Sequence, residues 1–152
     1  MSVIHEQQMR EALRIAAEGA SQGEVPVGAL IVRNSEIISL AHNETEQQTC
    51  ATAHAEILAI ERASKKLGRW RLDDCQLYVT LEPCPMCIGA ILLARIPELF
   101  FGCFDPKLGA VGSLFDLSAH ESIPQRVAVF PQLLEHDCRV MLQGFFQSRR
   151  SS

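Results

Sequence analysis

The stretch that most restricts the possible folds of this chain runs from residue 76 to residue 102. Two apolar runs within it, 76–81 and 99–102, have the composition of β-strands, and they flank a helical segment, 85–94, that begins with a proline. Pro85 suits the first turn of a helix, because its φ angle is already helical and its missing N–H would have had no partner. A strand, a helix and a strand in this order form a right-handed βαβ unit, so we expect the two strands to be parallel. The sequence therefore predicts an α/β protein.

The rest of the sequence predicts further helices and strands around this unit. Apolar positions at helical spacing predict helices at 4–20, at 54–67 with Thr52 as N-cap, and at 133–146. Apolar runs bounded by turn residues predict strands at 25–32, at 37–41 after a tight turn at Asn34-Ser35, and at a short edge strand, 127–130. Polar or Gly-rich sequence predicts loops at 44–49 and 105–113. No linker or repeat divides the chain, so we expect a single domain over residues 1–152.

Composition and charge favour a compact enzyme with a small substrate. The chain has 152 residues, of which 47% are hydrophobic, and this is enough to bury the core of one domain. Its net charge of −4 is unfavourable for contacts with phosphate groups. Basic residues are nevertheless clustered locally, at Lys65, Lys66, Arg69 and Arg71, and at Arg149 and Arg150. A small footprint on one RNA loop would need only a few such charges.

The N-terminal sequence and the cysteines indicate where the protein works. The first eleven residues are polar and charged and lack the apolar segment of a signal peptide, and no apolar run approaches membrane-spanning length. Six cysteines without secretory features are typical of a reducing compartment. We therefore expect a cytoplasmic protein with no membrane partner.

Two short motifs predict a catalytic metal site. Cys84 and Cys87 are three residues apart, so both sulfurs lie on one side of the first turn of a helix that begins at Pro85. The N-terminus of a helix favours thiolate over thiol. With His54 as a nitrogen ligand, three protein ligands would leave one position of a tetrahedral zinc ion free, as in catalytic zinc sites. Glu56, two residues after His54, is poorly placed to bind the same ion and is predicted to move a proton between an attacking water and the substrate.

A structural zinc site or a redox pair is the alternative for the two cysteines. A structural site needs a fourth ligand, and the other cysteines, Cys50, Cys75, Cys103 and Cys138, could be considered for it. None of them pairs with another at short spacing, so no second metal-binding knuckle is present. Cys50, four residues before His54, is the one that could approach the metal as an inhibitory fourth ligand.

The combination of H-x-E with P-C-x-x-C is the signature of the zinc nucleobase deaminases, and the chain resembles one family of them. Nearly the whole sequence is similar to the bacterial tRNA-specific adenosine deaminases, which convert the wobble adenosine of an anticodon to inosine. The segments that carry the resemblance include 24–29, 52–57, 77–84 and 109–113. The resemblance implies a cytidine-deaminase-like, three-layer α/β/α fold with a five-stranded mixed sheet. It also implies one Zn²⁺ per subunit, a homodimer, and a tRNA anticodon stem-loop as partner.

The same resemblance implies the residues that would bind the RNA. Val27 and Leu81 would line the target base, Asn43 would bond its edge, and the backbone at Ala55 and Pro83 would orient the attacked position. Asp105 and Lys107 would lie along the flanking nucleotides, and part of the RNA groove would be formed by Phe145, Phe146 and Arg150. The sequence departs from the family at Cys50-Ala51, where Asp-Pro is usual, and at Pro85, where a small or aliphatic residue is more frequent. From the residues alone, Val27 and Leu81 could be core, Asn43 and Asp105 could belong to turns, and Arg150 to a solvated end of the chain.

Two other functions fit parts of the same sequence. A deaminase of a free base, nucleoside or nucleotide, acting for example on guanine, cytosine or deoxycytidylate, would share the zinc site, and the acidic net charge supports it. A catalytically silent RNA-binding subunit would be expected to lack the proton-transferring glutamate, and Glu56 is present.

Overall fold

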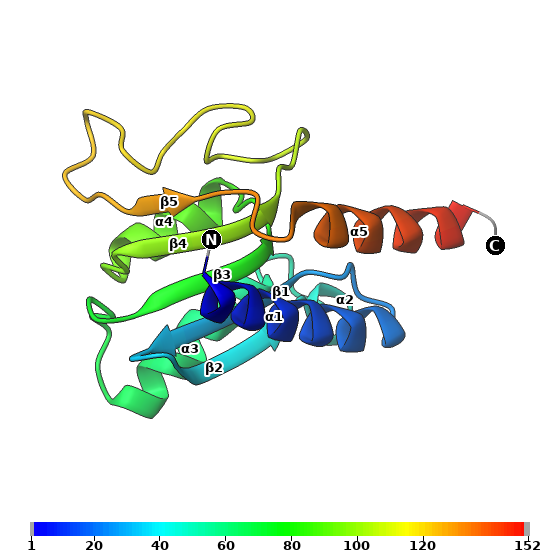
Figure 1. The fold of residues 1–152 in the computed structure, drawn as a ribbon, viewed down its shortest axis with the longest axis horizontal. Coiled ribbons are helices and arrows are strands. Elements are labelled where there is room, and N and C mark those ends of the chain that lie inside the picture. The colour runs from blue at the N-terminus through cyan, green and yellow to red at the C-terminus, as the bar shows by residue number, and fades with distance from the viewer. Residues whose placement is uncertain (1, 151–152) are drawn as a thin grey trace.

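The computed structural model describes residues 2–150, so the ends of the predicted 1–152 domain lie outside the described residues. Its centre is a five-stranded mixed sheet with the order β2-β1-β3-β4-β5 (Figure 1). The strands are β1 (Gly28–Arg33), β2 (Glu36–His42), β3 (Gln76–Leu81), β4 (Glu98–Cys103) and β5 (Ala128–Phe130). The helices are α1 (Val3–Ser21), α2 (Thr45–Gln48), α3 (Ala55–Leu67), α4 (Pro85–Leu93) and α5 (Glu135–Arg150).

The sheet is mixed because its strands are joined in two different ways. β1 and β2 form an antiparallel hairpin, whose turn residues Asn34 and Ser35 have φ angles of 51° and 65°. Positive φ at both central residues is what a two-residue hairpin turn requires. β3 and β4 are parallel, as predicted for the βαβ unit across α4, and β5 pairs in parallel with β4.

Helices cover both faces of the sheet, which confirms the predicted three-layer α/β/α fold. α1 and α5 lie on one face and α3 and α4 on the other (Figure 1). Successive side chains of a strand point to opposite faces, and the two buried clusters follow this alternation. Leu77 and Val79 of β3 pack in the cluster under α3 and α4, whereas Tyr78 packs in the cluster under α1 and α5.

Several boundaries differ from the predictions for physical reasons. β1 begins at Gly28 rather than at residue 25, because the backbone at Val25–Val27 closes a tight turn. Gly28 itself passes against α1, where a Cβ would lie 2.0 Å from the carbonyl oxygen of Ala12. The segment 44–49, predicted as a loop, contains the single-turn helix α2. α5 begins two residues later and ends four residues later than predicted.

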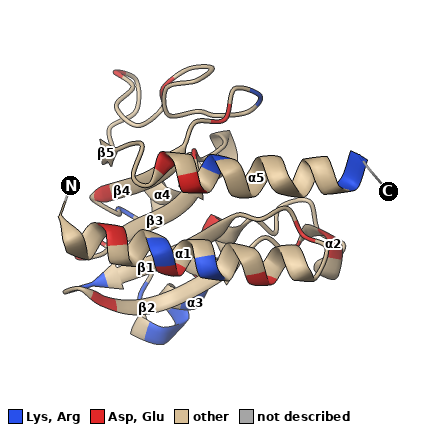
Figure 2. Ribbon diagram, turned by 45° about the vertical axis from the view of Figure 1, so that its right-hand side comes forward, with Lys and Arg blue, Asp and Glu red and all other residues tan. Residues whose placement is uncertain are grey.

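Charged residues are spread over the surface, with acidic and basic residues interspersed along α1 (Figure 2). α5 carries acidic residues in its first turn and Arg149 and Arg150 in its last. This distribution matches the helix dipole at both ends of α5. No helix within residues 2–150 is both long and apolar enough to cross a membrane.

Candidate metal and active site

The three predicted metal ligands come together where two helices begin. His54 is the N-cap of α3 and Cys84 the N-cap of α4, both with extended backbone, and Cys87 lies in the first turn of α4. α3 begins at Ala55, with His54 as its N-cap. The predicted N-cap, Thr52, is therefore wrong. The Nδ1 atom of His54 lies 3.6 Å from the sulfur of Cys84 and 3.5 Å from the sulfur of Cys87. All three donor atoms lie within 4.8 Å of one another.

This arrangement fits a single tetrahedral metal ion. Zinc bonds of about 2.3 Å to sulfur and about 2.0–2.1 Å to nitrogen place the two donor atoms about 3.5 Å apart at a tetrahedral angle. The observed S···N distances of 3.6 and 3.5 Å agree with that spacing. Within residues 2–150 no other His, Cys, Asp or Glu joins this ligand cluster, so Cys50 is not placed as a fourth ligand.

The sulfur atoms differ in their tendency to ionise. A hydrogen bond from the Cys87 thiol lowers the pKa of Cys84 to about 4, and the His54 contact acts in the same direction. The same bond to Cys84, together with burial, raises the pKa of Cys87. A cation bound between these two buried sulfurs would favour the thiolate form of both.

Glu56 lies beside the ligand cluster without belonging to it. Its side chain is 4% exposed, and burial raises its pKa to about 7, against the opposing effect of a backbone hydrogen bond. The spacing of His54 and Glu56 suggested that their side chains point to opposite sides of one regular helix. His54 instead precedes α3, so the two side chains are not held apart in this way. A carboxyl group whose pKa lies near neutral pH can both accept and return a proton.

A cavity of about 220 Å³ opens above these residues. The predicted residues Val27, Asn43, Leu81 and Asp105 lie in its wall, together with Val25, Thr45, Glu82 and Leu108. The side-chain oxygen Oδ1 of Asn43 accepts a 2.8 Å hydrogen bond from the N–H of Ala55. The Asn43 side chain therefore caps α3, and its NH₂ group is the part that can donate to a bound molecule. The Ala55 amide, predicted to contact the substrate, is engaged in this bond.

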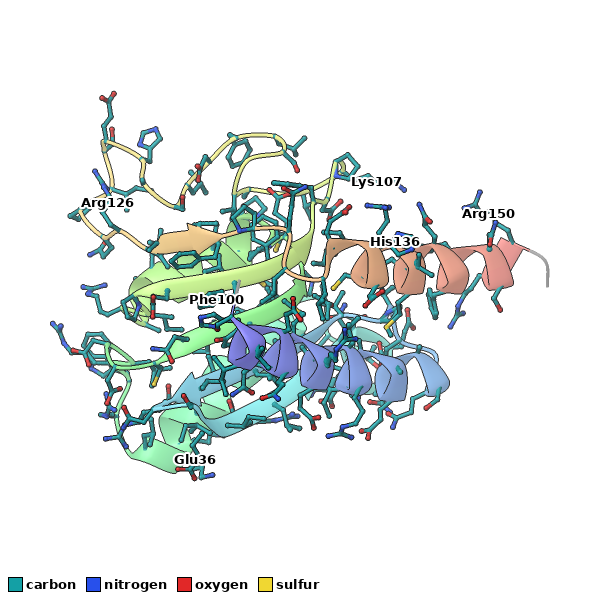
Figure 3. All side chains as sticks on the ribbon, viewed as in Figure 1. Glu36, Phe100, Lys107, Arg126, His136 and Arg150 are labelled. Atoms are coloured by element: carbon teal, nitrogen blue, oxygen red, sulfur yellow. The ribbon has the colours of Figure 1, made fainter. Side chains whose placement is uncertain are left out.

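A second, largely apolar groove of about 460 Å³ adjoins the cavity, and the two share Val25, Leu81 and Asp105. The predicted residues Lys107, Phe146 and Arg150 line this groove, with Phe104, Arg139 and Gln143 as neighbours that the sequence had not indicated. Figure 3 shows Lys107 beside the start of α5 and Arg150 at the far end of that helix. The groove therefore runs from the cavity along α5.

Two predicted contact residues are placed elsewhere. Phe145 lies outside this groove, where the guanidinium of Arg149 stacks 4.6 Å from its ring centre and also donates to the carbonyl of Gly23. Pro83 is buried and does not line the cavity, and its carbonyl oxygen accepts a hydrogen bond from the Ala110 amide. Adjacent residues on a helix point about 100° apart, which explains why Phe145 and Phe146 face different neighbours.

Comparison with known proteins identifies the family. The sequence matches the MafB19-like deaminase family over residues 3–150. The tRNA-specific adenosine deaminase of Bacillus subtilis (strain 168) is 47% identical over 142 residues, which are 93% of this chain and 88% of that protein. The chain belongs to the family of tRNA-specific adenosine deaminases.

Solved structures of deaminases share the fold of this family member. A structure from a study of A-to-I editing by tRNA:A34 deaminases at the wobble position of transfer RNA has a TM-score of 0.85 and 40% identity, covering 88% of this chain and 97% of that one. The guanine deaminase of Bacillus subtilis has a TM-score of 0.65 and 36% identity, covering 100% and 96%. These comparisons confirm the predicted family and the predicted cytidine-deaminase-like fold of this chain.

Proposed function

We propose that this enzyme deaminates the wobble adenosine of a tRNA anticodon to inosine, with one zinc ion per subunit. The observation that carries this proposal is the continuity of the cavity with the groove along α5. A free base needs only the cavity, whereas a nucleotide within an RNA loop also needs room for its neighbours. The groove provides that room, together with an exposed aromatic ring at Phe146 and the cations Lys107 and Arg150. Unpaired RNA bases are commonly bound by such rings and cations.

The residues around the cavity have distinct roles in this mechanism. A zinc ion held by His54, Cys84 and Cys87 would activate a water for attack on C6 of adenine. Glu56 is placed to pass one proton of that water to a ring nitrogen and, in a second transfer, the other proton to the departing amine. Val27 and Leu81 present apolar walls to the base, and the Asn43 NH₂ group donates to its edge. Burial of the base next to Glu56 excludes other water from the reaction.

An inosine assay tests this function directly. The purified protein is incubated with an anticodon stem-loop that carries adenosine at the wobble position, and in parallel with free adenosine, guanine and cytidine. We expect inosine from the stem-loop and no comparable turnover of the free compounds. A stem-loop with guanosine at that position controls for degradation. Turnover of a free base alone would contradict the proposal.

Guanine is the alternative substrate that a specific observation supports. The guanine deaminase of Bacillus subtilis is 36% identical to this chain and matches it over its whole length. The groove along α5 and its basic residues favour RNA over a free purine, and the assay above includes guanine for this reason.

We also propose a cytoplasmic homodimer that forms through the faces of α3 and α4. This surface exposes Leu93 by 69% and Trp70 by 59% beside Ile57 and Ile60, and the side chains line a shallow apolar groove. Exposed apolar patches of this kind mark protein–protein contacts. The two helices also carry the metal ligands at their N-termini, so a partner subunit there would support the site. The cytoplasm is the compartment that holds the proposed substrate.

Leu93→Glu is expected to convert the dimer to a monomer. The new carboxylate would lose its hydration in the middle of an apolar contact and would gain no ion-pair partner, which is unfavourable. Light scattering after size-exclusion chromatography measures the mass of both proteins. Val140→Glu, which changes a similarly exposed apolar residue on α5, should keep the dimer mass. A wild-type protein that elutes with the mass of one chain at micromolar concentration would refute the homodimer.

A further inference from the structure

Buried carboxylates hold the two segments that flank the cavity, the helix α2 and the loop of residues 105–113. Glu24, Glu56 and Glu82 are the carboxylate residues buried within residues 2–150, and only Glu56 has a place in the mechanism above. Glu24 accepts hydrogen bonds from the backbone N–H groups of Glu46 (3.1 Å) and Gln47 (2.8 Å), so it anchors α2 on one side of the cavity. Glu82 anchors the loop of residues 105–113 on the other side.

Glu82 makes more hydrogen bonds to its loop than Glu24 does. Its Oε1 accepts from the N–H of Asp105 (2.9 Å) and from the hydroxyl of Ser113. Its Oε2 accepts from the N–H groups of Val111 (2.9 Å) and Ser113 (3.0 Å). These four donors come from both ends of the loop, and no Lys or Arg is among them. The carboxylate thus closes a loop that has no regular secondary structure of its own.

The loop in turn supplies residues to both substrate-facing surfaces. Asp105 and Leu108 line the cavity, and Lys107 lines the groove along α5. A shift of the loop would therefore move the groups that meet the target base and its neighbours. Glu82 itself is 2% exposed, and both of its oxygens are occupied by the loop.

The chemistry of this contact requires a carboxylate and a glycine. All four partners are donors, so an amide at residue 82 would turn its NH₂ group toward other N–H groups. The loop passes so close that a Cβ on Gly109 would lie 2.2 Å from Oε1 of Glu82 and 2.6 Å from the carbonyl oxygen of Asp105. A side chain at Gly109 would therefore push the loop away from the carboxylate.

We propose that Glu82 is a positioning residue, which fixes the 105–113 loop and thereby sets how tightly the enzyme binds the nucleotides at and beside the target base. The proposal rests on the proposed function for the identity of the substrate. Glu82 transfers no proton and binds no metal in this role. Its effect passes entirely through the loop.

Glu82→Gln and Gly109→Ala test the proposal from the two sides of the same contact. We expect both variants to retain the wild-type zinc content, to raise KM for the stem-loop roughly tenfold, and to keep kcat within about threefold. Amide hydrogen exchange should become faster at Asp105, Val111 and Ser113 in both. The double variant should be no worse than the more severe single variant, because each change releases the same loop. Ser113→Ala, which removes one of the four donors, should show a smaller effect in the same direction.

Asp116→Asn is the matched control. Asp116 is an exposed residue farther along the same region, and within residues 2–150 its carboxylate accepts hydrogen bonds only from Ser118. Its KM and kcat should equal those of the wild type.

Three outcomes would overturn the proposal. Loss of zinc from Glu82→Gln, or a fall in kcat with KM unchanged, would place Glu82 in the metal or proton-transfer machinery. An unchanged KM in all three variants would show that the loop does not depend on this contact. If Glu82→Gln fails to fold, Gly109→Ala and Ser113→Ala still decide the question. If the wild type converts only a free base, the proposed function is wrong. The positioning role is then tested separately, by the amide hydrogen exchange rates of the loop and by the KM for that base.

Discussion

Glu56→Gln should leave the metal in place and remove nearly all deaminase activity. The amide keeps the size of the buried carboxyl group and cannot accept the proton of the attacking water. We expect kcat to fall by about 10²–10⁴-fold, which is the usual contribution of a positioned general acid–base group. Metal content, measured by elemental analysis, should stay at the wild-type ratio, since Glu56 is not part of the ligand cluster.

Glu56→Ala gives a second measurement of the same role. It removes the carboxyl group entirely, and its activity should be as low as that of Glu56→Gln. A substantially active Glu56→Gln protein would mean that another group transfers the proton. Loss of metal from either variant would mean that Glu56 belongs to the metal site.

Cys87→Ala should lose both the metal and the activity. Cys87 is fully buried in the first turn of α4, and its sulfur is one of the three ligand atoms that the described part of the chain brings together there. With two remaining ligands the site cannot hold an ion as tightly. The variant should also lose the stabilisation that metal binding gives to the folded state. Its melting temperature should therefore no longer fall when a chelator is added, in contrast to the wild type.

Cys75→Ala is the matched control for this experiment. Cys75 is equally buried, but it lies before β3, away from the ligand cluster, and burial raises its pKa to about 11. The variant should keep both metal and activity. If Cys87→Ala retained a full equivalent of metal, the assignment of this residue as a ligand would be wrong.

The sequence predicted those parts of the fold that depend on local patterns. β3 has the predicted bounds, because its run of apolar, β-branched and aromatic residues is short and ends before Pro83. The parallel pairing of β3 and β4 followed from the βαβ rule. The N-cap of α3 was misplaced at Thr52, because His54 has an extended backbone outside the helix and the capping bond to Ala55 comes from Asn43, a residue distant in sequence.

The parts of the site that depend on distant contacts were not predictable from the pattern. Nothing local to Glu82 indicates that it binds the backbone at Asp105 and Ser113. Asn43 was expected at the substrate, and the structure also gives its side chain a bond to Ala55. Which of Phe145 and Phe146 lines the groove depends on which side of α5 faces it, and the sequence pattern does not give that side.

The separate anchoring of the two cavity walls has a consequence for how such enzymes diversify. The reaction centre is built from the starts of α3 and α4, whereas α2 and the 105–113 loop are each fastened by a single buried glutamate. Mutations, insertions or recombined segments in either wall can therefore accumulate while the centre keeps its geometry, provided that the fastening residue stays. Substrate preference and chemical competence would then be inherited as independent traits, and laboratory evolution toward new bases should concentrate its libraries in these two segments.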